Sequence, residues 1–335
     1  ANGQSAIRAI QTFIFVGREA NPVTLIAKLM SFRPINLSKD VAEKVQAKVN
    51  LHVSLLIAYR RLLMTQLNGK VFVITGSGDG IGRTTAQVAA QKGAHIIVND
   101  HNPDAAEETA KLIKNDGGKA DHFQLDVTDR DAVFELAKRV ETDFGGADLL
   151  LNNAGVSMRV SVEKMTVEEM EWMMGINVYG VLNGTQAFLS QIKESNGHII
   201  NVSSILGLIG MSTQSAYNAA KFAVAGFSEA LRLEMLDHDV RVSTVFPGGV
   251  RTKIATRTRL PQDEDTEEAR SELQKGFNQM AFTTPMDAGK IIVKGIEKES
   301  PRILIGRDAL HIDIMRRLFP ARYAKYLGLT RGLKT

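Results

Sequence analysis

The sequence predicts an α/β fold built on a parallel sheet that helices cover on both faces. Short apolar runs alternate with longer segments of helical periodicity between residues 68 and 307. The runs lack the apolar–polar alternation of half-exposed strands, which indicates that they are buried on both sides. The expected strands are 71–75, 96–99, 122–127, 149–152, 198–203, 241–246 and 303–305.

The segments between these strands predict the helices. They carry apolar residues at the spacing of a helix that packs on a sheet. The expected helices are 84–92, 105–115, 132–144, 167–192, 216–236 and 286–297. The sequence contains no internal repeat, and we assign residues 68–307 to one catalytic domain.

A segment at each end lies outside this pattern. Residues 1–67 are expected to form a helical extension that packs on the main domain or on a partner subunit. A helix lying on a membrane surface is the alternative for this extension. Residues 308–335 are expected to form a basic amphipathic tail, in which apolar residues alternate with arginines: Ile312, Met315, Leu318 and Phe319 with Arg316, Arg317 and Arg322.

The charge is unevenly distributed along the chain. Residues 1–70 contain ten Lys/Arg and three Asp/Glu, and residues 316–335 contain six Lys/Arg and no acidic residue. Residues 71–315 are acidic, with 25 basic and 34 acidic residues. The basic ends predict peripheral contact with an anionic membrane surface, or contact between subunits. Ordinary solvated helix faces are the alternative, and we expect no nucleic-acid partner.

The composition limits the chemistry that is possible. The chain has 335 residues, of which 44% are hydrophobic, and this suits a globular protein with a sizeable core. The absence of cysteine excludes disulfides, zinc–thiolate sites and thiol nucleophiles, and fits a reducing compartment. The seven histidines show no metal-ligand spacing, so no metal is expected. No apolar segment is long enough to cross a bilayer of about 30 Å, and we expect a cytoplasmic protein.

A glycine-rich loop joins the first strand to the first helix. Thr75–Gly82 contains Gly76, Gly80 and Gly82 in a G-x-x-x-G-x-G spacing. Glycine lets the backbone turn tightly and approach a pyrophosphate closely, and a helix N-terminus offers free N–H groups. The position between a strand and a helix therefore predicts a dinucleotide-phosphate site.

The acidic residue Asp100 ends the second strand. A carboxylate there can accept hydrogen bonds from both hydroxyls of an adenosine ribose, and it repels a 2′-phosphate. Asp79 adds negative charge, and His101 and Asn102 rather than an arginine follow Asp100. These residues favour NAD over NADP. A turn role for Asp100 before Pro103 is the alternative.

Tyr217 and Lys221 form the candidate catalytic pair. They stand four residues apart, so they share one face of a helix. A phenol with a pKa of about 10 is a poor base near neutrality. A neighbouring ammonium lowers that pKa and makes proton exchange with a substrate hydroxyl feasible. The spacing alone is a weak signal, because exposed Tyr–Lys pairs are common.

Other polar residues follow the predicted strands. Ser204 ends the fifth strand, thirteen residues before Tyr217, and its hydroxyl can donate to a developing alkoxide. Asn177 could hold a water that carries protons onward. The sequence Asn152–Gly155 follows the fourth strand and is expected to line the cofactor crevice, and Asp126 with Val127 ends the third strand beside the adenine.

Together these motifs resemble the short-chain dehydrogenase/reductase family in its compact form. The similarity runs from about Gly69 to about Ile305. It implies a Rossmann fold, a doubly wound sheet of about seven parallel strands. It also implies that Tyr217 is the acid/base, that Lys221 binds the nicotinamide ribose and tunes Tyr217, that Ser204 steadies the substrate oxygen and that Asn177 belongs to the proton relay.

The resemblance further implies a dinucleotide site, in which the loop from Pro247 to Thr252 lies beside the nicotinamide, and a substrate pocket. Tyr217 and Lys221 contribute to the dinucleotide site, together with Thr75, Gly76, Ser77, Gly80, Ile81, Gly82, Asp100, Asp126, Val127, Asn153, Ala154, Gly155, Pro247, Gly248, Val250 and Thr252. The substrate pocket is expected to consist of Ser204, Ile205, Leu206, Met211 and Tyr217. Relatives pair through the helices expected at 167–192 and 216–236, which implies a homodimer or homotetramer.

The sequence therefore predicts an NAD-dependent oxidoreductase that acts on a hydrophobic secondary alcohol or ketone. The loops 156–158 and 205–211 are mostly apolar and would form pocket walls, with simple packing as the alternative for 205–211. Residues 253–284 would form a third wall, in which the acidic run 263–268 is expected to be a solvated helix start, with a mobile lid as a further role. The tail lacks the short glycine-rich ending of fatty-acid-synthesis ketoreductases. Two alternatives stay open, an NADP-dependent carbonyl reductase of the same fold and a cofactor-binding regulatory or scaffold protein.

Overall fold

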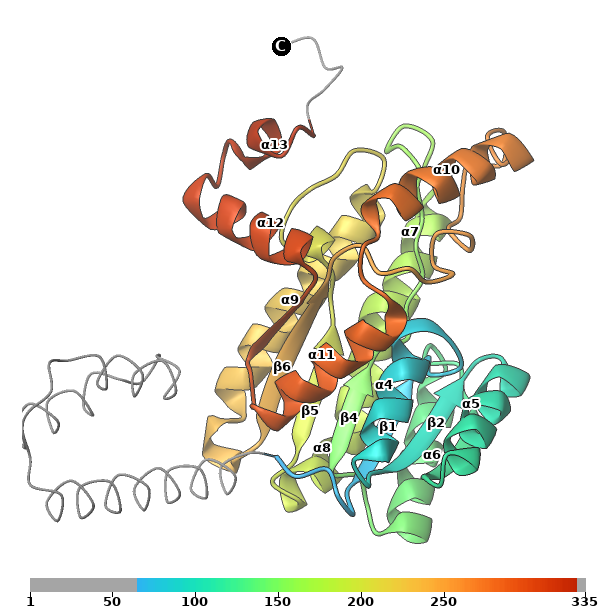
Figure 1. Cartoon of the computed structure of the whole chain (residues 1–335), viewed down its shortest axis with the longest axis vertical. Helices are drawn as coiled ribbons and strands as arrows, with labels where there is room; N and C mark the ends of the chain where they lie inside the picture. Colours follow the sequence, from blue (N-terminus) through green and yellow to red (C-terminus); the bar gives the residue numbers. More distant parts are fainter. Residues whose placement is uncertain (1–64, 330–335) are drawn as a thin grey trace, which may run out of the picture. The chain divides into compact units, whose positions relative to one another are not determined.

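Seven parallel strands form the centre of the computed structural model, which describes residues 65–329 (Figure 1). The strands lie in the order β3-β2-β1-β4-β5-β6-β7, which confirms the Rossmann fold. Nearly all of the predicted N-terminal helical extension lies outside the described residues. The strands are β1 (Val71–Thr75), β2 (His95–Asp100), β3 (Lys119–Gln124), β4 (Leu149–Asn152), β5 (His198–Val202), β6 (Arg241–Pro247) and β7 (Arg302–Ile305).

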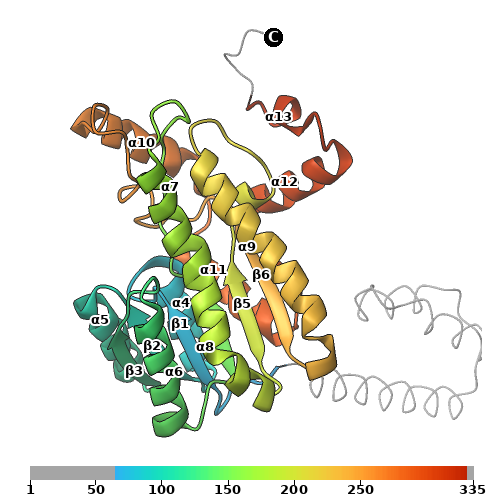
Figure 2. The ribbon, with the colours of Figure 1, turned by 180° about the vertical axis from the view of Figure 1, so that it is seen from behind.

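Among residues 65–329, three helices cover each face of the sheet. Figure 1 shows one face with α4 (Gly80–Gln91), α5 (Pro103–Asn115) and α11 (Pro285–Glu297). Figure 2 shows the opposite face with α6 (Arg130–Phe144), α8 (Gly180–Glu194) and α9 (Ser215–Glu234). Both faces of the sheet are thus removed from water, which explains why the strands read as continuous apolar runs.

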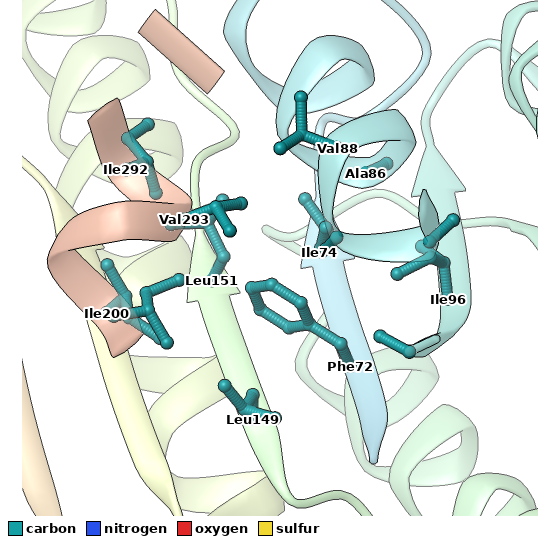
Figure 3. Packing of buried hydrophobic residues seen from close by; sticks show 14 of the residues in the cluster. Phe72, Ile74, Ala86, Val88, Ile96, Leu149, Leu151, Ile200, Ile292 and Val293 are labelled. Carbon is teal, nitrogen blue, oxygen red and sulfur yellow. The ribbon is translucent and has the colours of Figure 1, made fainter. Parts of the chain in front are cut away.

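Alternate side chains of each strand enter the two cores. Phe72 and Ile74 of β1 pack toward α4 and α11, whereas Val71 and Val73 pack toward α6 and α8. Figure 3 shows Phe72 close to Leu151, with Val293 of α11 above them. All of these side chains are buried, and full burial of one such side chain contributes about 1.5–3 kcal/mol.

The edge strand β3 differs from its prediction. The sequence predicts a strand over 122–127, but β3 spans Lys119–Gln124. This strand lies at the edge of the sheet and only Ala120 in it is buried, so it carries few apolar residues. Leu125 and Val127, which suggested the later position, follow the strand and pack in the core beside α6. The apolar pattern therefore identified the buried segment that connects β3 to α6, and not the hydrogen-bonded strand itself.

The helix predicted over 167–192 consists of three parts. An α-helix, α7 (Val167–Met174), starts at a capping box formed by Thr166 and Glu169. The π-helical turn η1 (Gly175–Tyr179) follows, and α8 continues the rod. Such π-turns are rare and occur mostly at functional sites, and this one contains Asn177.

All remaining helices except η3 (Leu236–His238), which precedes the start of β6, lie toward the carboxyl edge of the sheet (Figure 1). The acidic run at 263–268 leads into a helix, as expected, with Thr266 as its N-cap. Within residues 65–329, no helix combines the length and apolarity that crossing a membrane requires. These elements are η2 (Ile205–Gly207), η3 (Leu236–His238), α10 (Glu267–Met280), α12 (Arg307–Leu318) and α13 (Tyr323–Tyr326).

Candidate active site

The predicted site residues come together at the carboxyl edge of the sheet. All strands run in the same direction, so the loops after β1, β4, β5 and β6 leave from this edge. The strand order reverses between β1 and β4, and open α/β sheets bind ligands at such a switch point.

The glycine loop after β1 is held in a conformation that requires glycine. Gly76 and Gly80 have φ angles of 61° and 56°. A Cβ on Gly76 would lie 2.7 Å from the Cα of Ala154, and one on Gly82 would lie 2.5 Å from the carbonyl oxygen of Gly76. The helix α4 begins at Gly80, so its first-turn amides face the crevice side of the loop. This geometry fits a pyrophosphate group.

Side chains from neighbouring strands fix this loop. The Thr75 hydroxyl oxygen accepts hydrogen bonds from the amides of Asn153 (2.9 Å) and Ala154 (3.1 Å). The Asn153 side chain donates to the carbonyl oxygens of Thr75 (3.0 Å) and Gly76 (2.9 Å). The Ser77 hydroxyl donates to the carbonyl oxygen of Ile74 at 2.8 Å. The loops after β1 and β4 therefore form one hydrogen-bonded unit.

Asp100 lies beside the glycine loop at the end of β2. Its Oδ2 accepts a hydrogen bond from the Gly78 amide at 3.0 Å, and its Oδ1 accepts one from the Asn102 amide at 3.0 Å. Asn102 in turn caps α5. Asp100 thus has the turn role considered for it, and it also stands at the position expected for contact with an adenosine ribose.

Asp126 and Val127 lie beyond the end of β3 rather than in the strand. Asp126 Oδ1 accepts hydrogen bonds from the Thr128 amide (2.9 Å) and hydroxyl (2.8 Å). The Val127 carbonyl oxygen accepts one from the Asn183 side chain at 3.0 Å. Both residues therefore shape the connection to α6.

Asp79 serves the glycine loop as a capping residue. Its side chain accepts a hydrogen bond from the Gly80 amide at 2.7 Å, and it pairs with Lys253 and Arg257. Burial raises the pKa of the carboxyl, but the Gly80 amide and the two cations outweigh burial and lower the pKa overall. The two ion pairs therefore compensate the negative charge of Asp79 and connect the glycine loop to the segment after β6.

The loop after β6 closes the crevice opposite the glycine loop. A Cβ on Gly80 would lie 3.3 Å from Cγ2 of Thr252, so the two loops nearly touch. Val250 bridges to Thr283, which ties this loop to the chain before α11. Behind it, Asp308 accepts a hydrogen bond from the Gly249 amide at 2.6 Å. The expected nicotinamide loop from Pro247 to Thr252 thus has a fixed backbone.

Tyr217 and Lys221 lie one turn apart on α9 and are both buried. The Lys221 ammonium donates a hydrogen bond to the Val202 carbonyl oxygen at 3.0 Å. It lies 5.7 Å from the centroid of the Tyr217 ring. The pair therefore shares a dry site at the end of β5.

Burial controls the acidity of both groups. Burial raises the pKa of Tyr217 to about 12, although a hydrogen bond with Ser204 opposes this rise. Burial lowers the pKa of Lys221 to about 8. The net shift of the Tyr217 pKa is therefore upward, opposite to the lowering expected from the ammonium, and removal of water is its largest cause.

Ser204 lies against Tyr217 at the start of η2. Its hydroxyl accepts a hydrogen bond from the Leu206 amide at 3.1 Å and also bonds to the phenol. The Leu206 bond fixes the Ser204 side chain at the carboxyl end of β5. A hydroxyl that is held in this way can donate to an oxygen bound beside Tyr217.

Asn177 lies within the π-turn and is fully buried. Its side chain accepts a hydrogen bond from the Val156 amide (3.2 Å) and donates to the Val156 carbonyl oxygen (3.1 Å). A Cβ on Gly155 would lie 2.6 Å from Asn177 Oδ1 and 3.4 Å from Lys221 Nζ. Asn177 therefore holds the loop after β4. Its Oδ1 and the Nζ of Lys221 both lie beside Gly155.

The loop from Ile205 to Met211 covers the catalytic pair. Leu206 is buried, and Ile205 and Met211 are partly buried in the same apolar cluster as Tyr217. Sequence reasoning missed Asn218, whose side chain donates to the carbonyl oxygens of Leu206 and Ile209 (2.7 Å each) and accepts from the Met211 amide (3.0 Å). A polar residue on a buried helix face beside Tyr217 was the available signal.

The segment from 253 to 284 docks on the loop after β4. Its backbone pairs at Arg259 with Ser157 and Arg159, and the Arg259 guanidinium stacks on Trp172 at 3.7 Å. Lys164 pairs with Asp263 and Glu264. A cavity of about 490 Å³ lies between these segments, with mixed polar and apolar walls: Arg159, Ser161, Lys164, Thr213, Leu260, Pro261, Glu264, Ala269, Glu272 and Leu273.

Comparisons with known proteins agree with this geometry. The family model described as "short chain dehydrogenase" matches residues 70–263. The chain belongs to the short-chain dehydrogenase family. Among the relatives of this short-chain dehydrogenase, SadH of Mycobacterium tuberculosis is 38% identical over 268 residues, which are 79% of this chain and 96% of SadH. The 3-oxoacyl-[acyl-carrier-protein] reductase FabG of Thermotoga maritima is 34% identical, over 68% of this chain and 90% of FabG.

Solved structures show the same fold. A short-chain dehydrogenase/reductase of Burkholderia phymatum in complex with NAD superposes with a TM-score of 0.69 and 26% identity, over 79% of this chain and 97% of that one. A short-chain dehydrogenase of Mycobacterium paratuberculosis bound to NAD superposes with a TM-score of 0.64 and 26% identity, over 74% and 100%. The chain is thus an oxidoreductase of a family that uses nicotinamide cofactors, acting on alcohol or carbonyl groups.

The lowered pKa of Lys221 has a consequence for stability. Between pH 8 and 10.5 the unfolded chain retains the lysine proton that the folded protein releases, so this group makes the free energy of unfolding rise with pH. The Lys221→Met variant should therefore be more stable than the wild type at pH 7, and the difference should shrink toward pH 10. Urea unfolding of the apoprotein at both pH values measures this.

The exposed Lys290 on α11 provides the control. Lys290→Met should leave stability unchanged within about 0.5 kcal/mol at both pH values. If Lys221→Met destabilises the protein equally at pH 7 and pH 10, the protonation argument is wrong and Lys221 acts through packing alone.

Proposed function

We propose that this protein is an NAD-dependent dehydrogenase that interconverts a hydrophobic secondary alcohol and its ketone. The proposal depends on one observation, the joint burial of Tyr217, Ser204 and Lys221 at the edge of the sheet that carries the glycine loop. When bound there, the nicotinamide supplies or accepts the hydride. The chain itself must orient the substrate, exclude water and move one proton.

The residues divide this work by position. Ser204 and Tyr217 share a hydrogen bond, so a substrate oxygen between them would receive two donors. Tyr217 gives its proton to that oxygen during reduction and takes it back during oxidation. Lys221 and Asn177 meet at Gly155, where a water could carry the proton away from Tyr217. The apolar cluster around Tyr217 keeps bulk water out.

Replacement of the phenol tests this mechanism. Tyr217→Phe keeps the ring in the apolar cluster but removes the proton that the reaction needs. Turnover should fall by about 10²–10⁴-fold, the usual contribution of an acid/base group, while dinucleotide affinity stays nearly constant. Nicotinamide absorbance with a panel of secondary alcohols and ketones measures turnover, and nucleotide fluorescence measures dinucleotide affinity.

Tyr326→Phe provides a matched control, because it makes the same change at a tyrosine of α13 that is 52% exposed. It should leave turnover within about twofold of the wild type. Full activity of Tyr217→Phe would disprove the mechanism. Dinucleotide binding without turnover of any substrate in the wild type would favour a regulatory or scaffold role.

The apolar loop over the catalytic pair supports a hydrophobic substrate. Ile205, Leu206 and Met211 contribute to a cluster that also contains Met158 and Met173, and unbranched methionine side chains adapt to varied apolar shapes. The cavity with mixed walls beside Arg159 and Lys164 supports a substrate that also carries a polar group. Activity confined to small polar sugars would contradict this proposal.

The residues around Asp100 support NAD as the preferred cofactor. The carboxylate stands at the end of β2, where a 2′-phosphate would meet its negative charge. The structural relatives from Burkholderia phymatum and Mycobacterium paratuberculosis hold NAD. One observation favours NADP: Arg83 donates to Gly78, next to Asp100, but Arg83 is already paired with Glu108 at 2.6 Å.

The relative affinities for NADH and NADPH distinguish between NAD and NADP as the preferred cofactor. The wild type should bind NADH at least about tenfold more tightly than NADPH, and Asp100→Asn should lower that ratio about tenfold, because it removes one charge but keeps an acceptor for Gly78. Fluorescence titration with both nucleotides measures the ratio. Asp104→Asn, at an exposed residue in the first turn of α5, is the control. Tighter binding of NADPH by the wild type would overturn the assignment.

Exposed apolar side chains support assembly into a homodimer or homotetramer. Phe222 and Leu233 lie on one face of α9 and are 42% and 67% exposed, and Tyr179 beside α8 is 57% exposed. A second copy would remove this surface from water. Leu233→Glu should therefore shift sedimentation-velocity profiles toward the monomer, whereas Leu310→Glu on α12 should not. A monomeric wild type would refute the proposal.

The outer surface of α12 and α13 supports contact with anionic lipid. Leu310, Ile314 and Leu318 are exposed at helical spacing, and arginines flank them. An identical surface on a second copy would bring the same positive charges together, so a lipid surface is the better partner. The N-terminal basic segment invoked for the same contact lies outside the described residues.

Vesicle co-sedimentation tests the lipid contact. The full chain should bind vesicles containing about one third phosphatidylserine, and not pure phosphatidylcholine, because each cation near the surface contributes about 1 kcal/mol. Arg317→Gln with Arg322→Gln should weaken this binding, whereas Lys290→Gln should leave it unchanged. Retention of the wild type in the supernatant at low salt would end this proposal.

A further inference from the structure

The C-terminal segment contacts the loop that covers the catalytic pair. Figure 1 shows α12 and α13 at the carboxyl edge of the sheet, beyond β7. Ile312 of α12 and Tyr323 of α13 pack on the apolar cluster that contains Tyr217, as do Leu327 and Leu329. The segment is therefore part of the wall around the reaction site.

Two polar contacts fix the outer side of the loop from Ile205 to Met211. The Tyr323 hydroxyl oxygen accepts a hydrogen bond from the Gly210 amide at 3.0 Å. The Arg316 side chain donates to the Leu208 carbonyl oxygen at 3.2 Å, and its guanidinium lies 5.2 Å from the Tyr323 ring centroid. A second bond from Arg316, to the Pro320 carbonyl oxygen, holds α12 and α13 together.

Asn218 holds the inner side of the same loop from α9. Its three hydrogen bonds satisfy backbone groups of Leu206, Ile209 and Met211, which leaves Leu208 and Gly210 to the C-terminal segment. The two sets of contacts alternate along the loop. The loop position therefore depends on α9, which also carries Tyr217, and on the C-terminal segment.

The same segment begins at the loop after β6. Asp308, in the first turn of α12, accepts the hydrogen bond from Gly249, and a Cβ on Gly248 would meet its carboxylate. The helix thus runs from the expected nicotinamide loop to the substrate loop. Because α12 is a rigid element, the two loops are held at a constant separation.

We propose that Tyr323 and Arg316 are positioning residues that set which substrates fit, by holding the loop 205–211 against the apolar cluster around Tyr217. This inference rests on the proposed function. Neither residue takes part in the proton transfer, and both act through the backbone of Leu208 and Gly210. Loosening of the loop would enlarge the ensemble of pocket shapes and weaken binding of substrates that contact Ile205 and Met211.

The test compares Tyr323→Phe with Tyr326→Phe in the full chain. Tyr323→Phe keeps the ring and removes only the acceptor for Gly210, and Tyr326 is a half-exposed tyrosine of the same helix whose ring stacks on Phe319. The substrates are secondary alcohols from 2-butanol to 2-decanol. The readouts are kcat and KM for each alcohol, KM for the dinucleotide, and amide hydrogen exchange of residues 205–211.

The expected result is specific to the substrate side. Tyr323→Phe should raise KM for the longer alcohols about three- to tenfold, the usual effect of one lost hydrogen bond, while KM for the dinucleotide and kcat change less than about twofold. Exchange of the Gly210 amide should become faster. Tyr326→Phe should match the wild type in every readout, and Arg316→Met should reproduce the Tyr323→Phe pattern.

Two outcomes would overturn the inference. One is unchanged exchange over residues 205–211 in Tyr323→Phe, which would show that the loop does not depend on this contact. The other is an equal rise of KM for all alcohols and for the dinucleotide, which would indicate general loosening. Failure of the wild type to turn over any alcohol counts against the proposed function instead, and the exchange result then still decides whether Tyr323 holds the loop.

Discussion

Burial of a parallel sheet on both faces is the constraint on which the rest of this protein depends. A strand covered on both sides must pair its backbone groups with its neighbours, and parallel strands need crossover helices to do so. Every strand therefore ends at the same edge, where the loops after β1, β4, β5 and β6 converge. The candidate active site consists of what these loops carry, although its residues are far apart in the sequence.

The same burial determines the electrostatics of the site. Tyr217 and Lys221 are buried in a helix that lies on the sheet, and the loss of water shifts their pKa values in opposite directions, to about 12 and about 8. Both shifts favour the neutral forms of the side chains. A proton can then pass between two groups whose charged forms are both disfavoured by the loss of water. A bound dinucleotide would enter an environment with little competing solvent.

Asparagine side chains connect the loops to this framework. Asn153 holds the glycine loop, Asn177 holds the loop after β4, and Asn218 holds the loop after β5. A carboxamide carries both a donor and an acceptor, so it can pair with backbone groups as a strand does without bringing a charge into the interior. The loops can therefore be irregular and still have their buried polar groups satisfied.

The sequence by itself determined the α/β fold class, the glycine loop and the pair Tyr217 and Lys221. These features depend on the local hydrophobic period and on short spacings between residues. It misplaced β3, a largely exposed edge strand with few apolar residues, and it missed the π-turn at Asn177, which changes the helix by a single turn. The tertiary structure alone decided that burial is the largest influence on the pKa of Tyr217, and that Asn218, Arg316 and Tyr323 hold one loop. Those facts depend on water exclusion and on contacts between distant segments, and neither is encoded in the spacing of neighbouring residues.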